Sequence, residues 1–398
     1  MKPSSAYEQS FNFSLRSLCI ARLLAIATIT AGLFALAGIN AGAEQRGMLE
    51  ALHKHATLTS TVTDNGDLNP YAVIIAPVSA GRITAGDVLV DNFNNVANLQ
   101  GTGTTIVDYN PNTRKTSLVA KLSQRDPRCP GGVGLSTAMT MLKSGWIIVG
   151  STPSTDGTTK TKGNGCLFVL DPNGNVVTAW TGPDIDDPWG NMATVDHGTT
   201  AQLFISMAGF DLQGPNVKDP ATGAPPIVRK AKVLRLDLAI PDGKPPTIQS
   251  QTVIADGLPE QADLDNFLFG PTGVALGADG MLYVSDGVGN RIMKIANAPT
   301  RTSSAGTGDT LTSGGLLRNP LSLIVLPNGH LLTCNGLNGQ AVEIDPVSGK
   351  QIYAQWLDVD QAQTPPGNGD LFGVAVKPDG SGLYYVEDDT NALVEVTQ

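Results

Sequence analysis

Carboxylate and amide side chains gather at points of the sequence where an aromatic residue followed by Gly leads into an apolar segment. Three such segments are Asp187-Pro188-Trp189-Gly190, Phe267-Leu268-Phe269-Gly270 and Asp370-Leu371-Phe372-Gly373. Carboxylate and amide oxygens are the ligands that Ca²⁺ takes, and aromatic rings can hold a ligand by stacking. The candidate ligand-binding residues are Asp187, Trp189, Asn191, Asp370 and Phe372. The candidate metal ligands among them are Asn191, Asp187 and Asp370.

The segments that would position these residues repeat along the chain. The clearest copy, at 270–295, reads Gly-Pro-Thr-Gly-Val, Asp-Gly, Leu-Tyr-Val-Ser-Asp and Asn-Arg-Ile, which indicates strands joined by tight turns. Similar copies follow at 319–344 and 372–396, and three weaker copies precede it. The first strands of the six copies are centred on residues 73, 139, 193, 274, 323 and 374.

A fourth, outer strand is expected after most copies, at 117–120, 176–180, 247–254 and 351–356, and fits only poorly near 310. The last copy stops at its third strand, and the alternating segment at 57–62 can supply the strand it lacks. Closing the ring in this way removes exposed sheet edges. The sequence therefore predicts an all-β fold, a six-bladed β-propeller at 70–398 closed by an outer strand from the N-terminal segment at 44–69.

This repeat pattern resembles the NHL-repeat family of six-bladed β-propellers, and exported bacterial members of it in particular. The resemblance implies the fold but no biochemical role. In such a fold the loops that lead into inner strands share one face, here called the upper face, with the loops between second and third strands. The long loops at 91–103, 151–165 and 208–229 belong to this face and are candidates for binding.

The aromatic-Gly segments have a second interpretation. The ring can wedge between neighbouring blades while Gly lets two backbones approach closely. That structural role is the one we expect for most of these rings.

The sequence gives little support for catalysis by a histidine side chain. His197 and His330 lie in or beside hairpin turns of the lower face, where we expect solvated side chains, and His53 and His55 precede the closing strand. The sequence has no Gly-x-Ser-x-Gly elbow, no phosphate-binding Gly-rich loop and no Cys-x-x-Cys pair.

Six-bladed sugar lactonases resemble this architecture too. That resemblance implies a central divalent metal, held by Glu, Asn and Asp at the starts of inner strands, which polarises a lactone carbonyl. Here Asn191 is the only amide close to such a position, with Asn319 and Asp370 slightly upstream. No cofactor is expected from the sequence, although calcium is possible.

Composition and charge narrow the function classes. The chain has 398 residues with 45 Gly and 26 Pro, which suits many short strands joined by turns. Its net charge of -10 would repel phosphate backbones, so nucleic-acid binding is not expected.

The first 43 residues read as a signal peptide. Lys2, Arg16 and Arg22 precede an uncharged run at 23–39, and Ala41-Gly42-Ala43 follows it as a cleavage site. A retained membrane anchor is the alternative. After cleavage no membrane insertion is expected, and the protein would be periplasmic or extracellular.

Three cysteines remain in the mature chain. An oxidising compartment would allow one bridge, and Cys129 with Cys166 is the expected pair because both fall on the upper side of the second blade. Three buried free cysteines are the alternative, and Cys334 is expected to stay free in either case.

The sequence thus favours an exported, monomeric propeller that binds a protein, peptide or carbohydrate on its upper face without catalysis. A divalent-metal-dependent hydrolase resembling sugar lactonases is the alternative.

Overall fold

The computed structural model describes residues 47–360 and 362–398. The predicted signal peptide and its cleavage site lie outside these residues. The described part consists of strands, with two short 3₁₀ helices, η1 (Leu49–Ala51) and η2 (Thr159–Thr161). No helix in this part of the chain is long and apolar enough to cross a membrane.

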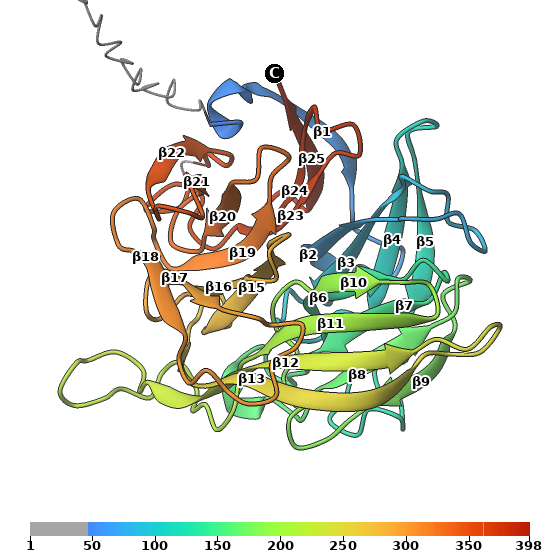
Figure 1. The fold of residues 1–398 in the computed structure, drawn as a ribbon, viewed down its shortest axis with the longest axis horizontal. Coiled ribbons are helices and arrows are strands. Elements are labelled where there is room, and N and C mark those ends of the chain that lie inside the picture. The colour runs from blue at the N-terminus through green and yellow to red at the C-terminus, as the bar shows by residue number, and fades with distance from the viewer. Residues whose placement is uncertain (1–46, 361) are drawn as a thin grey trace, which may run out of the picture. The chain divides into compact units, whose positions relative to one another are not determined.

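The strands form six antiparallel sheets within the described residues, which Figure 1 shows arranged as the blades of a propeller. Blade 1 contains β2 (Leu68–Ile75), β3 (Val88–Asn94), β4 (Thr105–Asn110) and β5 (Lys115–Lys121). Blade 2 contains β6 (Leu135–Met141), β7 (Ile147–Ser151), β8 (Cys166–Leu170) and β9 (Val176–Trp180). Blade 3 contains β10 (Ala193–Asp196), β11 (Thr200–Met207), β12 (Val228–Ala239), β13 (Thr247–Ala262) and β14 (Leu268–Phe269).

The remaining three blades complete the ring. Blade 4 contains β15 (Pro271–Leu276), β16 (Leu282–Asp286), β17 (Arg291–Ile295) and β18 (Asp309–Ser313). Blade 5 contains β19 (Pro320–Val325), β20 (Leu331–Asn335), β21 (Gln340–Ile344) and β22 (Gln351–Trp356). Blade 6 contains β23 (Leu371–Val376), β24 (Gly382–Glu387), β25 (Ala392–Thr397) and β1 (Lys54–Ser60). The predicted six-bladed propeller is confirmed.

The ring closes through β1, as the sequence predicts, although the strand lies at Lys54–Ser60 rather than at 57–62 and therefore includes His55. This strand pairs antiparallel with β25, with Lys54 opposite Thr397 and Thr57 opposite Val394. The first strand of the fold thus becomes the outer strand of the last blade, and β25 has a partner on both sides.

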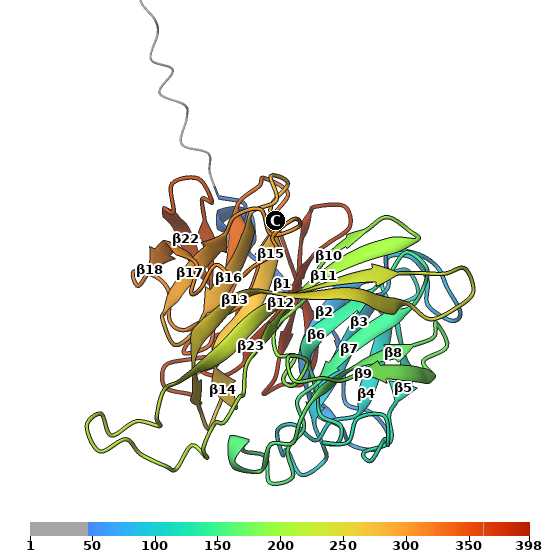
Figure 2. The ribbon, with the colours of Figure 1, turned by 60° about the horizontal axis from the view of Figure 1, so that its bottom comes forward.

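Blade 3 is larger than expected. Its outer strand β13 continues to Ala262, beyond the predicted end at 254, and its upper part pairs with β14. Figure 2 shows β12 and β13 running as long neighbouring strands, and the loop at 208–227 between β11 and β12 projecting from the molecule.

Apolar side chains pack between neighbouring blades. In one cluster, Val90 and Val107 of blade 1 pack with Val386 and Leu393 of blade 6. Buried serine hydroxyls add polar links because each donates to a backbone carbonyl of the next blade; these are Ser136 to Pro188, Ser206 to Thr272 and Ser285 to Leu321.

Glycine is required where these blades approach most closely. A side chain at Gly190 would collide with the carbonyl oxygen of Thr272, and one at Gly373 with that of Tyr71. The expected close approach behind the aromatic-Gly segments is therefore present at both positions.

His330 differs from expectation. Its side chain is buried rather than solvated, with Nδ1 2.7 Å from Oε1 of Glu343. Glu343 also accepts hydrogen bonds from the backbone N–H groups of Met48 and Leu49. The prediction was wrong because β21 provides the buried carboxylate of Glu343 beside this turn, and the N-terminal segment covers that carboxylate by donating two backbone N–H groups to it.

Cys129 and Cys166 form a disulfide with their Cα atoms 5.8 Å apart, and Cys334 is free and buried. The bridge joins the loop before β6 to the start of β8 in blade 2. Burial raises the pKa of the Cys334 thiol to about 11, which keeps it protonated and unreactive.

Candidate functional site

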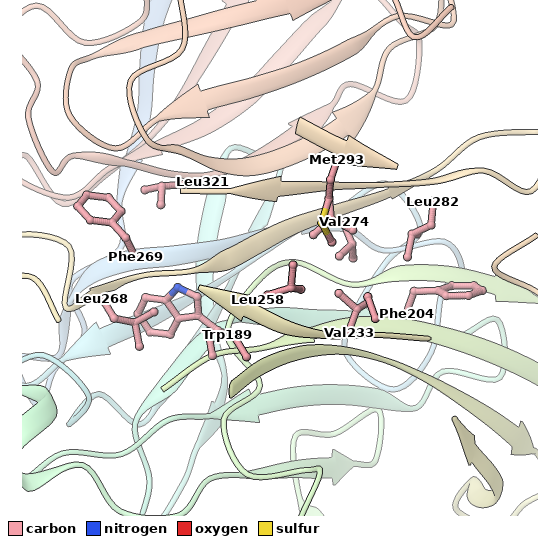
Figure 3. Packing of buried hydrophobic residues seen from close by; sticks show 14 of the residues in the cluster. Trp189, Phe204, Val233, Leu258, Leu268, Phe269, Val274, Leu282, Met293 and Leu321 are labelled. Atoms are coloured by element: carbon pink, nitrogen blue, oxygen red, sulfur yellow. The ribbon is translucent and has the colours of Figure 1, made fainter. Parts of the chain in front are cut away.

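Five aromatic rings close the upper end of the propeller axis. These residues, here called the aromatic plug, are Tyr71, Phe93, Trp189, Phe267 and Phe372. The Tyr71 ring stacks on Phe372 at 3.9 Å and on Phe93 at 4.3 Å between ring centroids, and Trp189 stacks on Phe267 at 5.7 Å. Each ring is at most 1% exposed. Figure 3 shows Trp189 beside Leu268 at one end of the surrounding apolar cluster, with Phe204 and Leu282 toward the other.

The plug changes the interpretation of two predicted ligand-binding residues. Trp189 and Phe372 are buried among other rings, so neither presents a face to a ligand at the surface. Along the axis beneath, Asn191 and Phe372 line a space of only about 10 Å³. That volume is at the lower limit for a single water molecule.

Asn191 links three blades. Its Nδ2 donates to the carbonyl oxygens of Val274 at 2.9 Å and Leu323 at 3.1 Å, and its Oδ1 accepts from the N–H of Leu323 at 3.3 Å. Both ends of the amide are therefore occupied by backbone groups of blades 4 and 5.

Asp187 lies in a separate buried cluster at the upper side of blade 3. Its Oδ1 is 2.5 Å from Nζ of Lys162, and its carboxyl group lies beside Gly209. Burial raises the pKa of Asp187 to about 7 even though Lys162 opposes the shift. Glu260 accepts from the N–H of Gly209 and from that of Phe210 at 3.1 Å, and burial raises the pKa of Glu260 to about 8.

The three predicted metal ligands consequently do not form one set. Asn191 is held by backbone groups, Asp187 pairs with Lys162, and Asp370 lies with the acidic residues described below. The described residues around the axis do not fit a central metal of the lactonase type, because the aromatic plug fills the place where inner strands begin.

A polar cavity of about 510 Å³ lies at the upper face and is here called the polar cup. Two of its residues lie close to the aromatic plug in sequence: Asn69 is two residues before Tyr71, and Asn94 follows Phe93. The cup is lined by Asn69, Asn94, Asn98, Gln100, Leu264, Asp265, Gln363, Thr364, Asn368, Gly369, Asp370 and Asp388. Leu264 is the one apolar side chain in this lining.

Three side-chain amides of the cup donate their N–H groups to acceptors within the protein. Asn69 Nδ2 donates to Oδ2 of Asp388 at 3.0 Å, Asn94 Nδ2 to Asn98 Oδ1 at 2.7 Å, and Gln100 Nε2 to the carbonyl of Leu264 at 2.8 Å. The amide oxygens of Asn69, Asn94 and Gln100 are buried and accept no hydrogen bond within the described chain. The cup itself is bordered by amide and carboxyl side chains, whose chemistry suits hydroxyl groups or a cation.

Asp370 and Asp388 give the cup its charge. Burial, together with the nearby carboxyl groups of Asp388 and Asp358, raises the pKa of Asp370 to about 11. Burial also raises the pKa of Asp388 to about 7. At neutral pH the two carboxyl groups therefore hold at least one proton between them.

Of the predicted site residues, Asp370 lines the cup. The long loop at 91–103 contributes Asn94, Asn98 and Gln100, so one of the three loops singled out in the sequence borders the cavity. Asn69, Asp265 and Asp388 line the cup as well and were not among the predicted ligand-binding residues. The left-handed backbone of Asn69, with φ of 61°, is a local feature that a turn-type argument could have indicated.

No model of a known protein family matches the sequence, and no curated protein matches it. Solved structures do share the fold. A gluconolactonase of Xanthomonas campestris aligns with 13% identity and a TM-score of 0.52, over 87% of this chain and 90% of that one. A protein described provisionally as a gluconolactonase aligns with 14% identity and a TM-score of 0.51, over 89% of this chain and 96% of that one. At these identities the likeness shows the fold, a six-bladed β-propeller.

Proposed function

We propose that the polar cup binds a small hydroxyl-rich molecule and that the protein hydrolyses a sugar lactone or a related ester there. The observation that carries this proposal is a cavity of about 510 Å³ that is lined almost entirely by amide and carboxyl side chains, among them Asn98, Asp265 and Asp388. Sugar hydroxyl groups are donors of matching chemistry, and a volume of about 510 Å³ accommodates a monosaccharide-sized ligand.

The reaction can be written with groups that the cup provides. Water attacks the lactone carbonyl carbon while the Asp388 carboxylate, held by Asn69, accepts its proton. The ring C–O bond then breaks, and the departing oxygen takes up a proton to give a hydroxy acid. One water is consumed, and no step passes through a metal. Two solved structures that share this fold are described as gluconolactonases, which supports the same substrate class.

Lactone hydrolysis tests this proposal. The full chain should hydrolyse glucono-1,5-lactone above the spontaneous rate in a pH-stat assay. Asp388→Asn, which keeps the acceptor for Asn69 Nδ2, should lower kcat by about 10²-fold because the proton acceptor is lost. Asp309→Asn, an exposed acidic residue of β18 in blade 4, is the matched control and should keep the wild-type rate. A wild-type rate equal to the spontaneous rate, or an unchanged rate in Asp388→Asn, would overturn the proposal.

A non-catalytic sugar-binding module is the second candidate. It is favoured by the lining of the cup, which contains no His, Ser or Cys side chain. This candidate predicts a calorimetric binding signal with gluconate or glucose and no lactone turnover. The assay above therefore separates the two.

We also propose that the chain is an exported member of the NHL-repeat family. The repeat at 270–295 supports the family assignment, and the signal-like segment at 1–43 supports export. The Cys129–Cys166 disulfide is consistent with an oxidising compartment.

A further inference from the structure

A second cavity lies beside the polar cup, between the outer parts of blades 5 and 6. This cavity, here called the side groove, has a volume of about 740 Å³. It is lined by His55, Thr57, Trp356, Leu357, Asp358, Val359, Asp360, Tyr385, Glu387, Asp389, Thr390 and Val394. The cup and the side groove share a wall of carboxyl groups, because Asp370 and Asp388 line the cup while Asp358 and Asp389 line the groove.

Three of these carboxyl groups converge. One oxygen atom from each of Asp358, Asp370 and Asp389 lies within 4.8 Å of the other two. They come from three separate segments: the loop after β22, the residue before β23, and the turn between β24 and β25. Ring closure and the packing of blade 5 on blade 6 bring these segments together.

Each of the two buried acids of this cluster has one oxygen that receives no hydrogen bond from an N–H or hydroxyl group of the described chain. Asp358 and Asp370 are 6% and 4% exposed, and Oδ2 of each accepts no hydrogen bond within the described chain. The other oxygen of Asp358 accepts from the N–H of Asp360 at 2.8 Å, which fixes the carboxyl group. Among the described residues, no Lys, Arg or His forms an ion pair with any of the three acids.

The amide of Asn69 provides a separate indication of a ligand at this wall. Asn69 is 7% exposed, its Nδ2 holds Asp388, and its Oδ1 is buried in the cup without a partner. Asp388 in turn interacts with the side chain of Asp370, so the amide belongs to the same buried polar network as the cluster. A cation held by the cluster would neutralise its buried carboxyl groups.

We propose that Asp358, Asp370 and Asp389 bind a Ca²⁺ ion in the wall between the polar cup and the side groove. Two ligands of one ion can be no further apart than twice the ion–oxygen distance, about 4.6–5.2 Å for Ca²⁺ and about 4.0–4.2 Å for Mg²⁺. Three oxygens that all lie within 4.8 Å of one another fit within the calcium span, and Ca²⁺ accepts irregular sets of carboxylate ligands more readily than Mg²⁺ does. Asp389 is exposed, so water can complete the coordination from the groove. This site lies away from the axis and goes beyond the proposed function.

Calorimetry on the full chain tests the site. After treatment with EDTA and removal of the chelator, titration with CaCl₂ should show binding at about one ion per chain. Asp358→Asn should weaken the calcium affinity at least 10-fold, because one anionic ligand is lost while the acceptor for the N–H of Asp360 is kept. Asp309→Asn should bind as the wild type does. MgCl₂ should bind more weakly than CaCl₂.

Thermal unfolding provides the control for folding. Without calcium, Asp358→Asn should melt at or above the wild-type temperature because repulsion within the cluster falls. Calcium should raise the melting temperature of the wild type and leave that of the variant nearly unchanged. No calcium binding by the wild type at millimolar concentration, or an equal calcium affinity in Asp358→Asn, would overturn the proposal. Neither result depends on lactone hydrolysis, so the two proposals fail separately.

Discussion

Asn191 lies at the start of the inner strand of blade 3, and its amide reaches the backbone of blades 4 and 5. In the sequence this residue was the best-placed amide for a metal. A ligand and a structural amide look identical in sequence, since only the neighbouring blades determine what the amide meets. In the structure both Nδ2 and Oδ1 of Asn191 form hydrogen bonds with backbone groups.

Asn191→Ala should therefore act on stability. It leaves the carbonyls of Val274 and Leu323 without a side-chain donor, and an unsatisfied buried polar group costs about 1–3 kcal/mol. We expect the free energy of unfolding in urea to fall by about 2 kcal/mol, with the calcium affinity of the folded chain unchanged. A variant as stable as the wild type but unable to bind calcium would show instead that Asn191 is a ligand.

The cup residues show a second limit of sequence reasoning at this scale. Asp370 was identified because it lies in an aromatic-Gly segment, whereas Asn69 and Asp388 are more than 300 residues apart in the chain and meet only after the ring has closed. The orientation of the Asn69 amide follows from Asp388, and no local pattern encodes it.

At the scale of elements, the upper end of β13 carries a buried acidic pair. Glu260 of β13 and Asp187 of the loop before β10 both have a raised pKa, mainly through burial. Lys162 faces both groups and lowers the pKa of each. The pKa of Asp187 is also raised by Asp186 and lowered by Lys232. A carboxyl group whose pKa is higher in the folded than in the unfolded state stabilises the fold at low pH, and that stability is lost as pH rises through the folded-state value.

The free energy of unfolding should accordingly decrease from about pH 4–5, where these carboxyl groups ionise in the unfolded chain, and should level off above about pH 8, where Asp187 and Glu260 have ionised in the folded chain as well. We expect a loss on the order of 2 kcal/mol over this interval. Glu260→Gln keeps an acceptor for the N–H groups of Gly209 and Phe210 and removes the ionisation, so its profile should be flatter. Urea unfolding measured across this pH range would contradict the interpretation if the two profiles had the same slope.

The extent of β13 could not be predicted from local sequence. Gly257 and Pro259 disfavour a regular strand, and the expected strand ended at 254. The structure continues the strand to Ala262 because β12 pairs with it through several register shifts and β14 pairs with its end. Tertiary pairing thus overrides local propensity in this blade.

At the scale of the whole molecule, the repeat pattern was enough to predict six blades and their closure. The turns Asp279-Gly280 and Asn328-Gly329 and the alternating segment that becomes β1 are local signals, and a closed ring is the arrangement that leaves no sheet edge bare. The projecting loop at 208–227 and the position of the cup depend on packing among blades and could not be predicted in this way.

Closure should also support stability. Removing residues 1–60 deletes β1 and exposes the edge of β25, so we expect the melting temperature to fall by about 10 °C or more and the protein to self-associate in light scattering. Removing residues 1–46 retains β1 and is the matched control. Equal melting temperatures for the two shortened chains would contradict a contribution of β1 to the closed ring.

The position of a bound ligand shows directly whether the polar cup is the functional site. The measurement is a crystal structure of the full chain grown with gluconate, the product expected from the lactone. We expect electron density for the hydroxy acid in the cup, with its hydroxyl groups in contact with the amide and carboxyl side chains of the lining, Asp388 among them. Gluconate bound at another face, or a cup without gluconate under conditions where calorimetry shows binding, would contradict it.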